Sequence, residues 1–362
     1  MILVAWFIFL FTVLQFLIAF INMITRPKLN RVFDPWEGLV SILIPVRNEE
    51  DNVKNIMNDL VHQEYKNIEI LVYDDESDDN SVEVIKNFSE RDPRIRLIRS
   101  TGLLKGWLGK MYACHTLSQQ AKGEYLLFLD ADVRIQHDAV SKAVSYMRHY
   151  ELGLLSVFPR QIMQTTGEWI TVPVMNYILL SLLPLILVRI SNFSSLAAAN
   201  GQFMLFNASI YNSILPHEKT KMNLVEDIAI SRMYKKKGIR IACLVGDNTI
   251  QCRMYENFHA ALHGFSKNIT AFFGNSFLLA LIFWFITTVG FVVLLWVLPI
   301  DIFLLYIMLY ISTRVIISVI SQQNVLLNSI FTIPQQIIIG LLIYRAFINF
   351  RLQYYQWKGR SL

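Results

Sequence analysis

Polar and acidic residues cluster where three short apolar runs of the sequence end. Residues 40–46 are followed by Arg47, Asn48 and Glu49, residues 68–73 by Asp74 and Asp75, and residues 125–129 by Asp130 and Asp132. Each cluster alone is typical of a turn that caps a helix. Three of them in succession, each after a strand-like run, favour a common site.

Carboxylates at the ends of neighbouring strands fit chemistry on a phosphate. Two acids that converge on one site repel each other unless a divalent cation lies between them. Mg²⁺ or Mn²⁺ binds carboxylate oxygens together with the oxygens of a diphosphate, and it neutralises the charge that develops on a departing diphosphate. We therefore predict a Mg²⁺ or Mn²⁺ cofactor at these strand ends.

Glu226 and Asp227 are the candidates for a second requirement of such a transfer, a base that takes the proton from an attacking hydroxyl. They begin a run with helical character, residues 228–237. Acids at a helix start also interact favourably with the helix dipole, but that interpretation explains one acid better than two.

Alternating strand-like and helical segments must position these residues. We expect strands at 40–46, 68–74, 95–98 and 125–130, and helices at 50–63, 80–90 and 109–121. Such alternation predicts a mostly parallel sheet. Ligands of sheets of this kind bind beyond the carboxyl ends of the strands, which is where the acids lie.

The composition indicates a membrane protein. Of 362 residues, 54% are hydrophobic and 17% are charged, and the mean hydropathy is +0.40. A soluble domain has about 45–50% apolar and about 25% charged residues, so an ordinary soluble protein and a disordered chain are excluded. The net charge of +5 is attributed to basic flanks of membrane segments, and no nucleic-acid partner is expected.

Residues 1–24 carry no charge and are long enough to span a bilayer. They have neither a basic start nor a cleavage site, so we expect an anchor rather than a cleaved signal peptide. Arg26, Lys28 and Arg31 follow directly. Because basic flanks stay on the inner side, the N-terminus is predicted to face outward. The chain beyond residue 25 is then on the cytoplasmic face of the cell membrane.

The C-terminal region is predicted to hold two or three spanning or re-entrant segments. Its uncharged stretches are 268–300, 302–313 and 315–344, and its basic tail holds Arg345, Arg351, Lys358 and Arg360. The tail favours an even number of crossings, whereas the apolar length suits three. Arg314 interrupts these stretches, and we expect it to snorkel towards the membrane interface.

A further uncharged stretch, residues 169–188, contains Pro173 and Pro184. A true crossing here would separate the acids of the strand ends from Glu226 and Asp227. We therefore predict an interfacial or re-entrant segment that lies on the membrane. A buried helix of the sheet-containing region is an equally weighted alternative.

Five motifs in order, PVRNEE, VYDDESDD, GWLGK, GEYLLFLDADV and VEDIAISR, are similar to those of family 2 glycosyltransferases with the GT-A fold. The resemblance covers about residues 38–265. The segments GWLGKMYACH, CRMYENF…GFSKN (252–268) and WKGR resemble a membrane-anchored subgroup that glycosylates carotenoid and hopanoid lipids. The resemblance implies an α/β domain of the GT-A type, with a Rossmann-like, mostly parallel sheet, an N-terminal transmembrane helix and a C-terminal transmembrane bundle.

By this resemblance, the first strand ends would bind the nucleotide of a UDP-sugar. The residues concerned are Pro45, Arg47, Asn48 and Glu49, with Asp74 at the uracil edge and Asp75 beside it. Lys110 would reach the nucleotide or its diphosphate. On its own, a lysine at a helix start is an ordinary surface residue.

The resemblance also assigns the metal, the base and the acceptor side. Asp130 and Asp132 match the Asp-x-Asp motif that binds the metal, with Asp132 as the direct ligand and Asp130 also at the nucleotide. Asp227 matches the general base. The acceptor or diphosphate side would include Asn200, Gly201, Gln202, Glu226 and Arg253.

We therefore predict an inverting, metal-dependent hexosyltransferase that moves one sugar from a UDP-sugar to a membrane lipid. Alternatives are transfer to a polyprenyl phosphate, synthesis of a polysaccharide and, in a different class, a non-catalytic membrane scaffold or transporter. Processive synthases of the family carry a Gln-x-x-Arg-Trp motif. Polymer synthesis is disfavoured here because no Arg-Trp follows Gln251. The predicted organisation is an anchor (1–25), a nucleotide-sugar-binding half (26–165), an acceptor half (166–265), membrane segments (266–348) and a basic cytoplasmic tail (349–362).

Overall fold

A seven-stranded sheet forms the centre of the structure, a computed structural model that describes residues 1–362 except 31, 33–34, 353–355, 358–359 and 362. Its strands are β1 (Val40–Val46), β2 (Ile68–Asp74), β3 (Ile95–Arg99), β4 (Tyr125–Leu129), β6 (Leu154–Phe158), β8 (Phe203–Asn207) and β9 (Ile241–Val245). They lie in the order β3-β2-β1-β4-β8-β6-β9, and β8 alone runs against its neighbours. A smaller sheet contains β5 (Val133–Ile135), β10 (Ile250–Cys252) and β7 (Arg160–Gln161). The predicted mostly parallel α/β sheet is confirmed.

Helices surround this sheet, and six of its seven strands are almost wholly buried, whereas the edge strand β3 (IRLIR) is only partly buried. These helices are α2 (Glu50–Val61), α3 (Ser81–Ser89), α4 (Gly109–Gln120), α5 (Ala139–His149), α9 (Ala208–Ile214), α10 (Pro216–Lys219) and α11 (Glu226–Lys236). The apolar side of α2 holds Val53, Ile56, Met57 and Leu60, and all four are fully buried in the same core as β1. Their spacing is that of one helix face.

The carboxyl ends of β1, β2 and β4 meet at one edge of the sheet. Val46 lies opposite Asp74 in the β1–β2 register, and Leu43 lies opposite Phe128 in the β1–β4 register. Because these strands are parallel, the polar clusters that follow them leave the sheet at the same edge.

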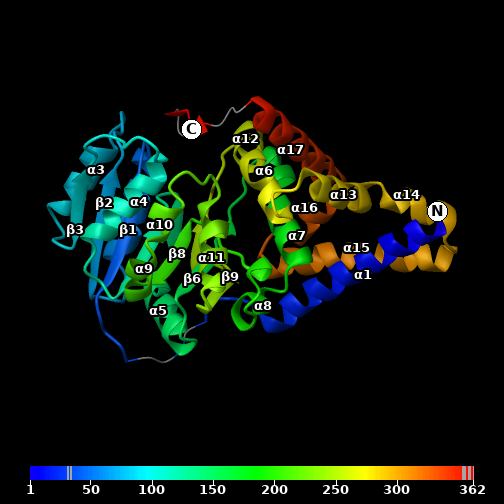
Figure 1. Ribbon diagram of the computed structural model, residues 1–362, viewed down its shortest axis with the longest axis horizontal. Coiled ribbons are helices and arrows are strands. Elements are labelled where there is room, and N and C mark those ends of the chain that lie inside the picture. The colour runs from blue at the N-terminus through cyan, green and yellow to red at the C-terminus, as the bar shows by residue number, and fades with distance from the viewer. Residues whose placement is uncertain (31, 33–34, 353–355, 358–359, 362) are drawn as a thin grey trace.

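A group of helices extends from one side of the sheet domain (Figure 1). It comprises α1 (Ile2–Thr25), α6 (Thr166–Thr171), α7 (Pro173–Leu182), α8 (Leu185–Ile190), α12 (Phe258–Asn268), α13 (Phe277–Thr288), α14 (Gly290–Val297), α15 (Ile300–Ile320), α16 (Val325–Ile330) and α17 (Thr332–Leu352), with 3₁₀ turns η1 (Ser194–Leu196) and η2 (Ile269–Phe273). α1 packs along α15, and α13 packs along α17. Two short strands, β11 (Gln356–Trp357) and β12 (Arg360–Ser361), follow. Arg31 and Lys358, which entered the topology prediction, lie outside the described residues.

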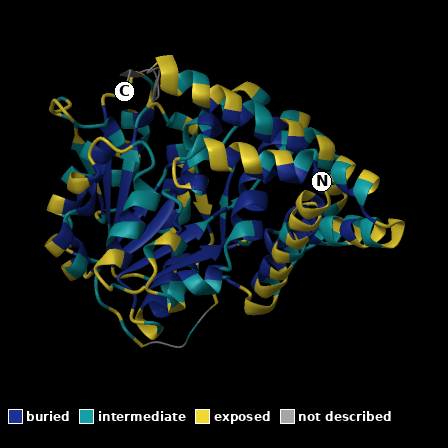
Figure 2. Cartoon of the chain, turned by 45° about the vertical axis from the view of Figure 1, so that its right-hand side comes forward, coloured by how far each residue is buried: buried dark blue, intermediate teal, exposed yellow. Residues whose placement is uncertain are grey.

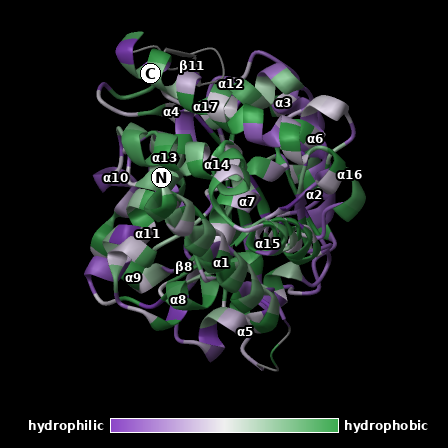
Figure 3. Ribbon diagram, turned by 90° about the vertical axis from the view of Figure 1, so that its right-hand side faces the viewer, coloured by the Kyte–Doolittle hydropathy of each residue, from purple (hydrophilic) through white to green (hydrophobic). Residues whose placement is uncertain are grey.

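Three helices in the described part of the chain, α1, α15 and α17, are long and apolar enough to cross a membrane. Two of them follow residue 268. Helix α12 with η2 meets the same criterion together with α13, although the pair is bent by 97°. Only 33%, 28% and 39% of the three long spans is buried. Figure 2 shows exposed residues along the helices near the N-terminus, and Figure 3 shows that this end of the molecule is hydrophobic.

The central part of the predicted interfacial or re-entrant stretch, residues 169–188, forms α7, and this helix is enclosed by protein. Every residue of α7 except Leu182 is buried. The helix packs against α1, α15 and α17. A helix on a membrane surface would instead leave one apolar face uncovered. The interfacial interpretation therefore does not fit α7, which packs against the candidate membrane helices and not within the sheet domain.

Arg314 of α15 is also buried, so the prediction that it snorkels to an interface is wrong. Its guanidinium lies 3.6 Å from the centre of the Tyr177 ring and donates to Gln335 Oε1 at 2.9 Å. Gln335 of α17 in turn donates to the carbonyl oxygen of Trp169 at 3.0 Å. Stacking on Tyr177 and the hydrogen bond to Gln335 satisfy part of this guanidinium, whereas its buried Nε has no partner among the described residues. These contacts connect α15, α17, α7 and α6.

Candidate active site

A cavity of about 460 Å³ lies beyond the carboxyl ends of β1 and β4. The predicted site residues that line it are Pro45, Arg47, Glu49, Lys110, Asp130, Asp132, Asn200, Gly201, Gln202, Glu226 and Asp227. The predicted residues Asn48, Asp74, Asp75 and Arg253 are not among its lining residues. The fold thus brings residues that are up to 182 positions apart, from Pro45 to Asp227, to one cavity.

The reversed strand β8 positions the Asp-x-Asp turn. Phe203 pairs with Leu129, so the residue before β8, Gln202, lies beside the end of β4. The backbone N–H of Asp130 donates to the Gln202 carbonyl oxygen at 3.1 Å, and the N–H of Val133 donates to the Asp130 carbonyl oxygen at 3.2 Å. These bonds hold the turn between β4 and β5.

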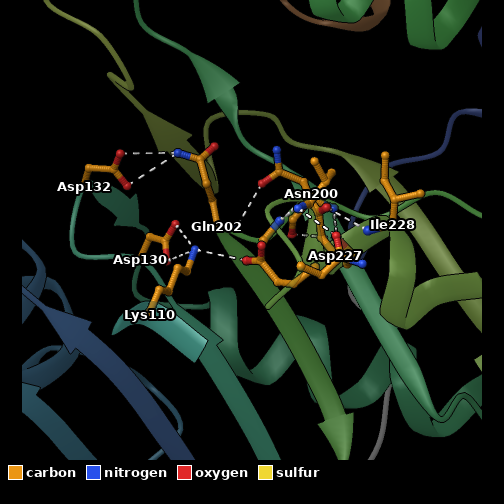
Figure 4. A network of polar contacts seen from close by, with 12 residues as sticks. Lys110, Asp130, Asp132, Asn200, Gln202, Asp227 and Ile228 are labelled. Carbon is orange, nitrogen blue, oxygen red and sulfur yellow. Dashed lines mark hydrogen bonds and ion pairs between the residues drawn. The ribbon is translucent and has the colours of Figure 1, made fainter. Parts of the chain in front are cut away.

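Lys110, near the start of α4, lies between two carboxylates (Figure 4). Its Nζ is 2.8 Å from the Asp130 carboxylate and 3.6 Å from Glu226 Oε1. Burial opposes a charge at this position, but the two carboxylates outweigh it and raise the pKa of Lys110 above its usual value. Lys110 is therefore a fixed cation at neutral pH, and it compensates the charge of Asp130.

Asp132 forms no ion pair among the described residues, although the charge of Lys110 also acts on it. Its carboxylate accepts a long hydrogen bond of 3.4 Å from Gln202 Nε2. Burial, together with the charges of Asp130 and Glu49, raises the pKa of Asp132 to about 7. The turn therefore carries negative potential that a cation would relieve.

The oxygen atoms of this turn fit a divalent cation that is shared with a substrate. Among the residues that the structure describes, no three His, Cys, Asp or Glu side chains form a group that would hold a metal alone. Mg²⁺ commonly uses only one or two carboxylates and completes its shell with water and substrate phosphates. Asp132 and Asp130 together supply two carboxylates, which is the number that such a cation would need.

Asp227, in the first turn of α11, is held by backbone groups. Its Oδ2 accepts a hydrogen bond from the Gly201 N–H at 3.0 Å, and its Oδ1 accepts one from the Ile228 N–H at 2.7 Å. Burial and the neighbouring charge of Glu226 outweigh these bonds and raise the pKa of Asp227 to about 7. A Cβ on Gly201 would lie 3.1 Å from Glu226 Oε1, so the close approach favours glycine. A carboxyl group of this pKa is suited to accept a proton near neutral pH.

Another wall of the cavity comes from α12 and the segment before it. Ala260, His263, Gly264 and Lys267 line the cavity, as does Tyr255. A Cβ on Gly264 would overlap the Tyr255 ring. Lys267 lies in the GFSKN segment of the motifs, but those motifs assign no role to His263 or Lys267. Their positions on one i, i+3, i+4, i+7 helix face are the signal that indicates them.

Three predicted nucleotide-binding residues lie outside the cavity lining. Asp75 contacts Arg47, whereas Asp74 and Asn48 accept hydrogen bonds from the turn after β2. The Arg47 guanidinium donates to the carbonyl oxygen of Asp75, and its Nη1 lies 4.0 Å from the Asp75 carboxylate. Asp74 accepts from the Ser77 N–H at 3.3 Å. Asn48 adopts a left-handed φ of 52° and accepts from the Asp78 N–H at 2.8 Å. These contacts tie the ends of β1 and β2 together.

Arg253 lies just before the cavity-lining Met254 and pairs with a different partner. Its Nε donates to Glu168 Oε1 at 2.8 Å, and the Glu168 side chain has no exposed surface. Glu168 also caps α6, where its carboxylate accepts from the Thr165 N–H. The contacts of Arg253 are therefore those of a residue that fixes α6.

Replacing Arg253 with glutamine is expected to lower the free energy of unfolding by about 1–3 kcal/mol, because it leaves the buried Glu168 carboxylate without its cation. The KM for the sugar nucleotide should change little. Thermal unfolding in detergent and steady-state kinetics would measure the two effects. The double variant with Glu168→Gln serves as the control and should lose less stability than the sum of the single variants. A large rise in KM with unchanged stability would instead assign Arg253 to the diphosphate.

Comparisons with known proteins agree with this geometry. Residues 41–215 match the model of the glycosyl transferase family 2. The chain is 24% identical over 239 residues to a 4,4'-diaponeurosporenoate glycosyltransferase of Staphylococcus haemolyticus, and 25% identical over 246 residues to that of Staphylococcus aureus USA300. These matches cover 64% and 66% of this chain but only 60% and 62% of the relatives.

A solved mannosyltransferase from Pyrobaculum calidifontis, in complex with GDP-Man and Mn²⁺, superposes with a TM-score of 0.59 at 13% identity. The superposition covers 95% of this chain and 99% of that one. The fold is thus a GT-A-like α/β fold with apolar helices at both ends. Residues 41–215, which hold most of the sheet, are therefore similar to glycosyl transferase family 2.

Proposed function

We propose that this protein transfers one sugar from a UDP-sugar to a membrane lipid at the cytoplasmic face of the cell membrane, with inversion at the anomeric carbon. One observation carries the proposal. The cavity joins the Asp-x-Asp turn and the half-buried Asp227 to α12, which leads into an apolar helix pair long enough to enter a membrane. A soluble acceptor would not require that connection.

The sugar nucleotide would lie over the ends of β1, β2 and β4. Arg47 and Glu49 line the cavity there, and Lys110 supplies a fixed cation for the diphosphate. The mannosyltransferase of similar fold binds GDP-Man and Mn²⁺, which supports a nucleotide diphosphate and a divalent cation here. The choice of uridine as the nucleoside rests on the resemblance of the motif that contains Asp74 to the family motif that binds uracil.

Asp132, with Asp130, would hold Mg²⁺ or Mn²⁺ together with the diphosphate. When bound, such a cation stabilises the charge of the departing UDP. The residues between the metal-binding turn and Asp227 in the cavity wall are Asn200, Gly201 and Gln202. They would contact the sugar or the acceptor.

Asp227 would take the proton of an acceptor hydroxyl. The acceptor oxygen then forms a bond to the anomeric carbon, and the bond from that carbon to the UDP oxygen breaks, with the electron pair leaving on UDP. Attack from the face opposite UDP inverts the anomeric centre. An acceptor carboxylate, as the names of the Staphylococcus relatives suggest for those proteins, would need no proton transfer. The cytoplasmic placement is supported by Arg26 and Lys28, which directly follow α1.

The test uses the full chain in lipid nanodiscs with a total lipid extract of its host. UDP-glucose, UDP-galactose and UDP-N-acetylglucosamine are supplied in turn with Mn²⁺, and UDP release and the masses of lipid products are followed. A lipid that gains one hexose or N-acetylhexosamine is expected, and NMR of its anomeric proton should show inversion relative to the sugar nucleotide. A polymer product, or no UDP binding with any nucleotide, would contradict the proposal.

Replacing Asp132 with asparagine is expected to weaken Mn²⁺-dependent UDP binding by at least tenfold. The variant removes one carboxylate charge from a cation that relies on only one or two protein ligands. UDP binding measured by calorimetry with and without Mn²⁺ gives the effect. Asp301→Asn, at an exposed position in the first turn of α15, is the matched control. Equal Mn²⁺ dependence in Asp132→Asn and the unchanged protein would exclude Asp132 as a ligand.

A further inference from the structure

A second, mainly apolar cavity of about 140 Å³ lies next to the first. Its lining includes Ile178, Leu179, Leu182 and Leu183 from α7 and its C-terminal end, Ala197, Ala198 and Ala199 from the segment after η1, and Ala271 and Phe272 from η2. α7 packs against the candidate membrane helices α1, α15 and α17. The second cavity is therefore bordered by elements that belong to the membrane side of the molecule.

Three separate segments each line both cavities. In the segment before β8, residues 197–199 line the second cavity and residues 200–202 line the first. In α11, Asp227 lines the first and Ile228 the second. In the helix that contains α12 and η2, residues 267–268 line the first and residues 271–272 the second. The two cavities are thus neighbours across Gly201 and Asp227.

Figure 4 shows the same division around Asp227. Asp130, Asp132 and Lys110 lie on one side of it, and the Ile228 side chain lies on the other. Asp227, the proposed general base, would therefore lie at the boundary between the polar cavity and the apolar one, and it would face the sugar nucleotide.

Arg232 adds a charge to the apolar cavity. It lines this cavity one helical turn beyond Ile228. Among the described residues it forms neither a hydrogen bond nor an ion pair, and it is only partly exposed. A half-buried guanidinium with no acidic partner fits an anionic group on a ligand.

We propose that the second cavity binds the acceptor, and that the acceptor is an anionic lipid. Its apolar chain would lie against α7 and residues 197–199, and its phosphate or carboxylate would pair with Arg232. An apolar cavity of about 150 Å³ holds a molecule the size of benzene, so only the chain segment nearest the head group fits inside it. This inference rests on the proposed function, since it places the acceptor beside Asp227.

Binding is tested without any transfer reaction. The full chain in nanodiscs of neutral phospholipid is photolabelled with three diazirine probes of equal chain length, a fatty acid, an alkyl phosphate and a fatty alcohol, and the adducts are mapped by mass spectrometry. The two anionic probes should label residues of α7, 195–199 or η2 about fivefold more than the alcohol, an effect typical of a partly exposed ion pair. The stronger of the two anionic probes identifies phosphate or carboxylate as the preferred group.

Variants of Arg232 test the charge. Arg232→Gln should remove the preference for anionic probes, and Arg232→Lys should keep most of it. Lys236→Gln, an exposed position on the same helix, is the matched control and should have no effect. Equal labelling by the alcohol, or adducts spread over the exposed faces of α1 and α15, would overturn the inference.

Filling the cavity tests the path of the chain. Ala198→Leu should lower lipid labelling and lipid glycosylation together by about fivefold or more, while acceptor-independent release of UDP stays unchanged. Ala198→Ser is the size-matched control. Full lipid glycosylation by a folded Ala198→Leu variant would overturn the assignment of this cavity. A protein that glycosylates no lipid but still shows charge-dependent labelling of the cavity would contradict the proposed function and leave the lipid site supported.

Discussion

Replacing Asp227 with asparagine is expected to lower kcat for transfer to a lipid hydroxyl by about 10²–10⁴, while UDP binding remains almost unchanged. Asparagine keeps the size of the side chain, and its oxygen can accept one of the two backbone hydrogen bonds from Gly201 and Ile228. It cannot accept a proton. Single-turnover kinetics in nanodiscs would measure the loss, and calorimetry of UDP with Mn²⁺ would verify that the nucleotide site is intact.

The same variant distinguishes classes of acceptor. A phosphate or carboxylate is already ionised at neutral pH and needs no strong base, so transfer to either should survive Asp227→Asn far better than transfer to a hydroxyl. Full activity towards a hydroxyl acceptor would end the assignment of Asp227 as the base. Asp247→Asn, outside the cavity lining, gives the matched control.

The pH dependence follows from the same carboxyl group. Burial, and then the charge of Glu226, raises the pKa of Asp227 to about 7, and only the ionised form accepts a proton. The value of kcat/KM should therefore rise with pH, level off above about pH 8 and fall about tenfold per pH unit below 7. Saturating Mn²⁺ is needed because Asp132 also titrates near pH 7. A flat profile between pH 6 and 8 would contradict the role of Asp227.

Replacing Lys110 with methionine is expected to lower the free energy of unfolding by about 3 kcal/mol and to weaken UDP-sugar binding strongly. The Lys110 side chain is 22% exposed and the Glu226 side chain 13%, so removing the cation leaves two poorly hydrated carboxylates close together. Breaking such a pair costs about 3–5 kcal/mol when fully buried, and the partial exposure argues for the lower end. Thermal unfolding of the apo protein gives the stability, and UDP titration gives the affinity.

A second substitution separates the two effects of Lys110→Met. Adding Glu226→Gln removes one of the uncompensated charges, so the double variant should regain part of the lost stability but little of the UDP affinity. If both the stability and the UDP affinity were regained, Lys110 would contribute only to the stability of the fold. Recovery of neither would mean that Glu226 does not share the charge of Lys110.

Residues at strand ends were the most predictable part of this site. Parallel strands with short turns bring Asp130 and Asp132 to the same edge as Arg47, and the start of α11 holds Asp227 at the same cavity. Local sequence specifies each of these positions, because a strand end and a helix start are both readable from a few residues.

The remaining differences come from long-range packing. Arg253 is adjacent in sequence to a cavity residue, yet it pairs with Glu168, which is 85 residues away. The composition of α7 is the same whether lipid or protein covers it, so its burial required knowledge of α1, α15 and α17. Arg314 illustrates the same point, since Tyr177 and Gln335 partly satisfy a charge that would otherwise be expected at a membrane interface.

The contacts between α1 and α7 have a consequence for the synthesis of the chain. Gln15 of α1 donates to Ser181 Oγ at 3.1 Å, and Asn22 donates to the Leu180 carbonyl oxygen at 3.1 Å and accepts from the Leu185 N–H at 2.7 Å. These partners are 158–166 residues further along the chain. At a translation rate of about 5–20 residues per second, the amides of α1 wait on the order of 10–30 s for them. The hydrogen bonds of the first helix therefore form only after about half of the chain has been made, and a variant without α1 would leave Ser181, Leu180 and Leu185 without these partners.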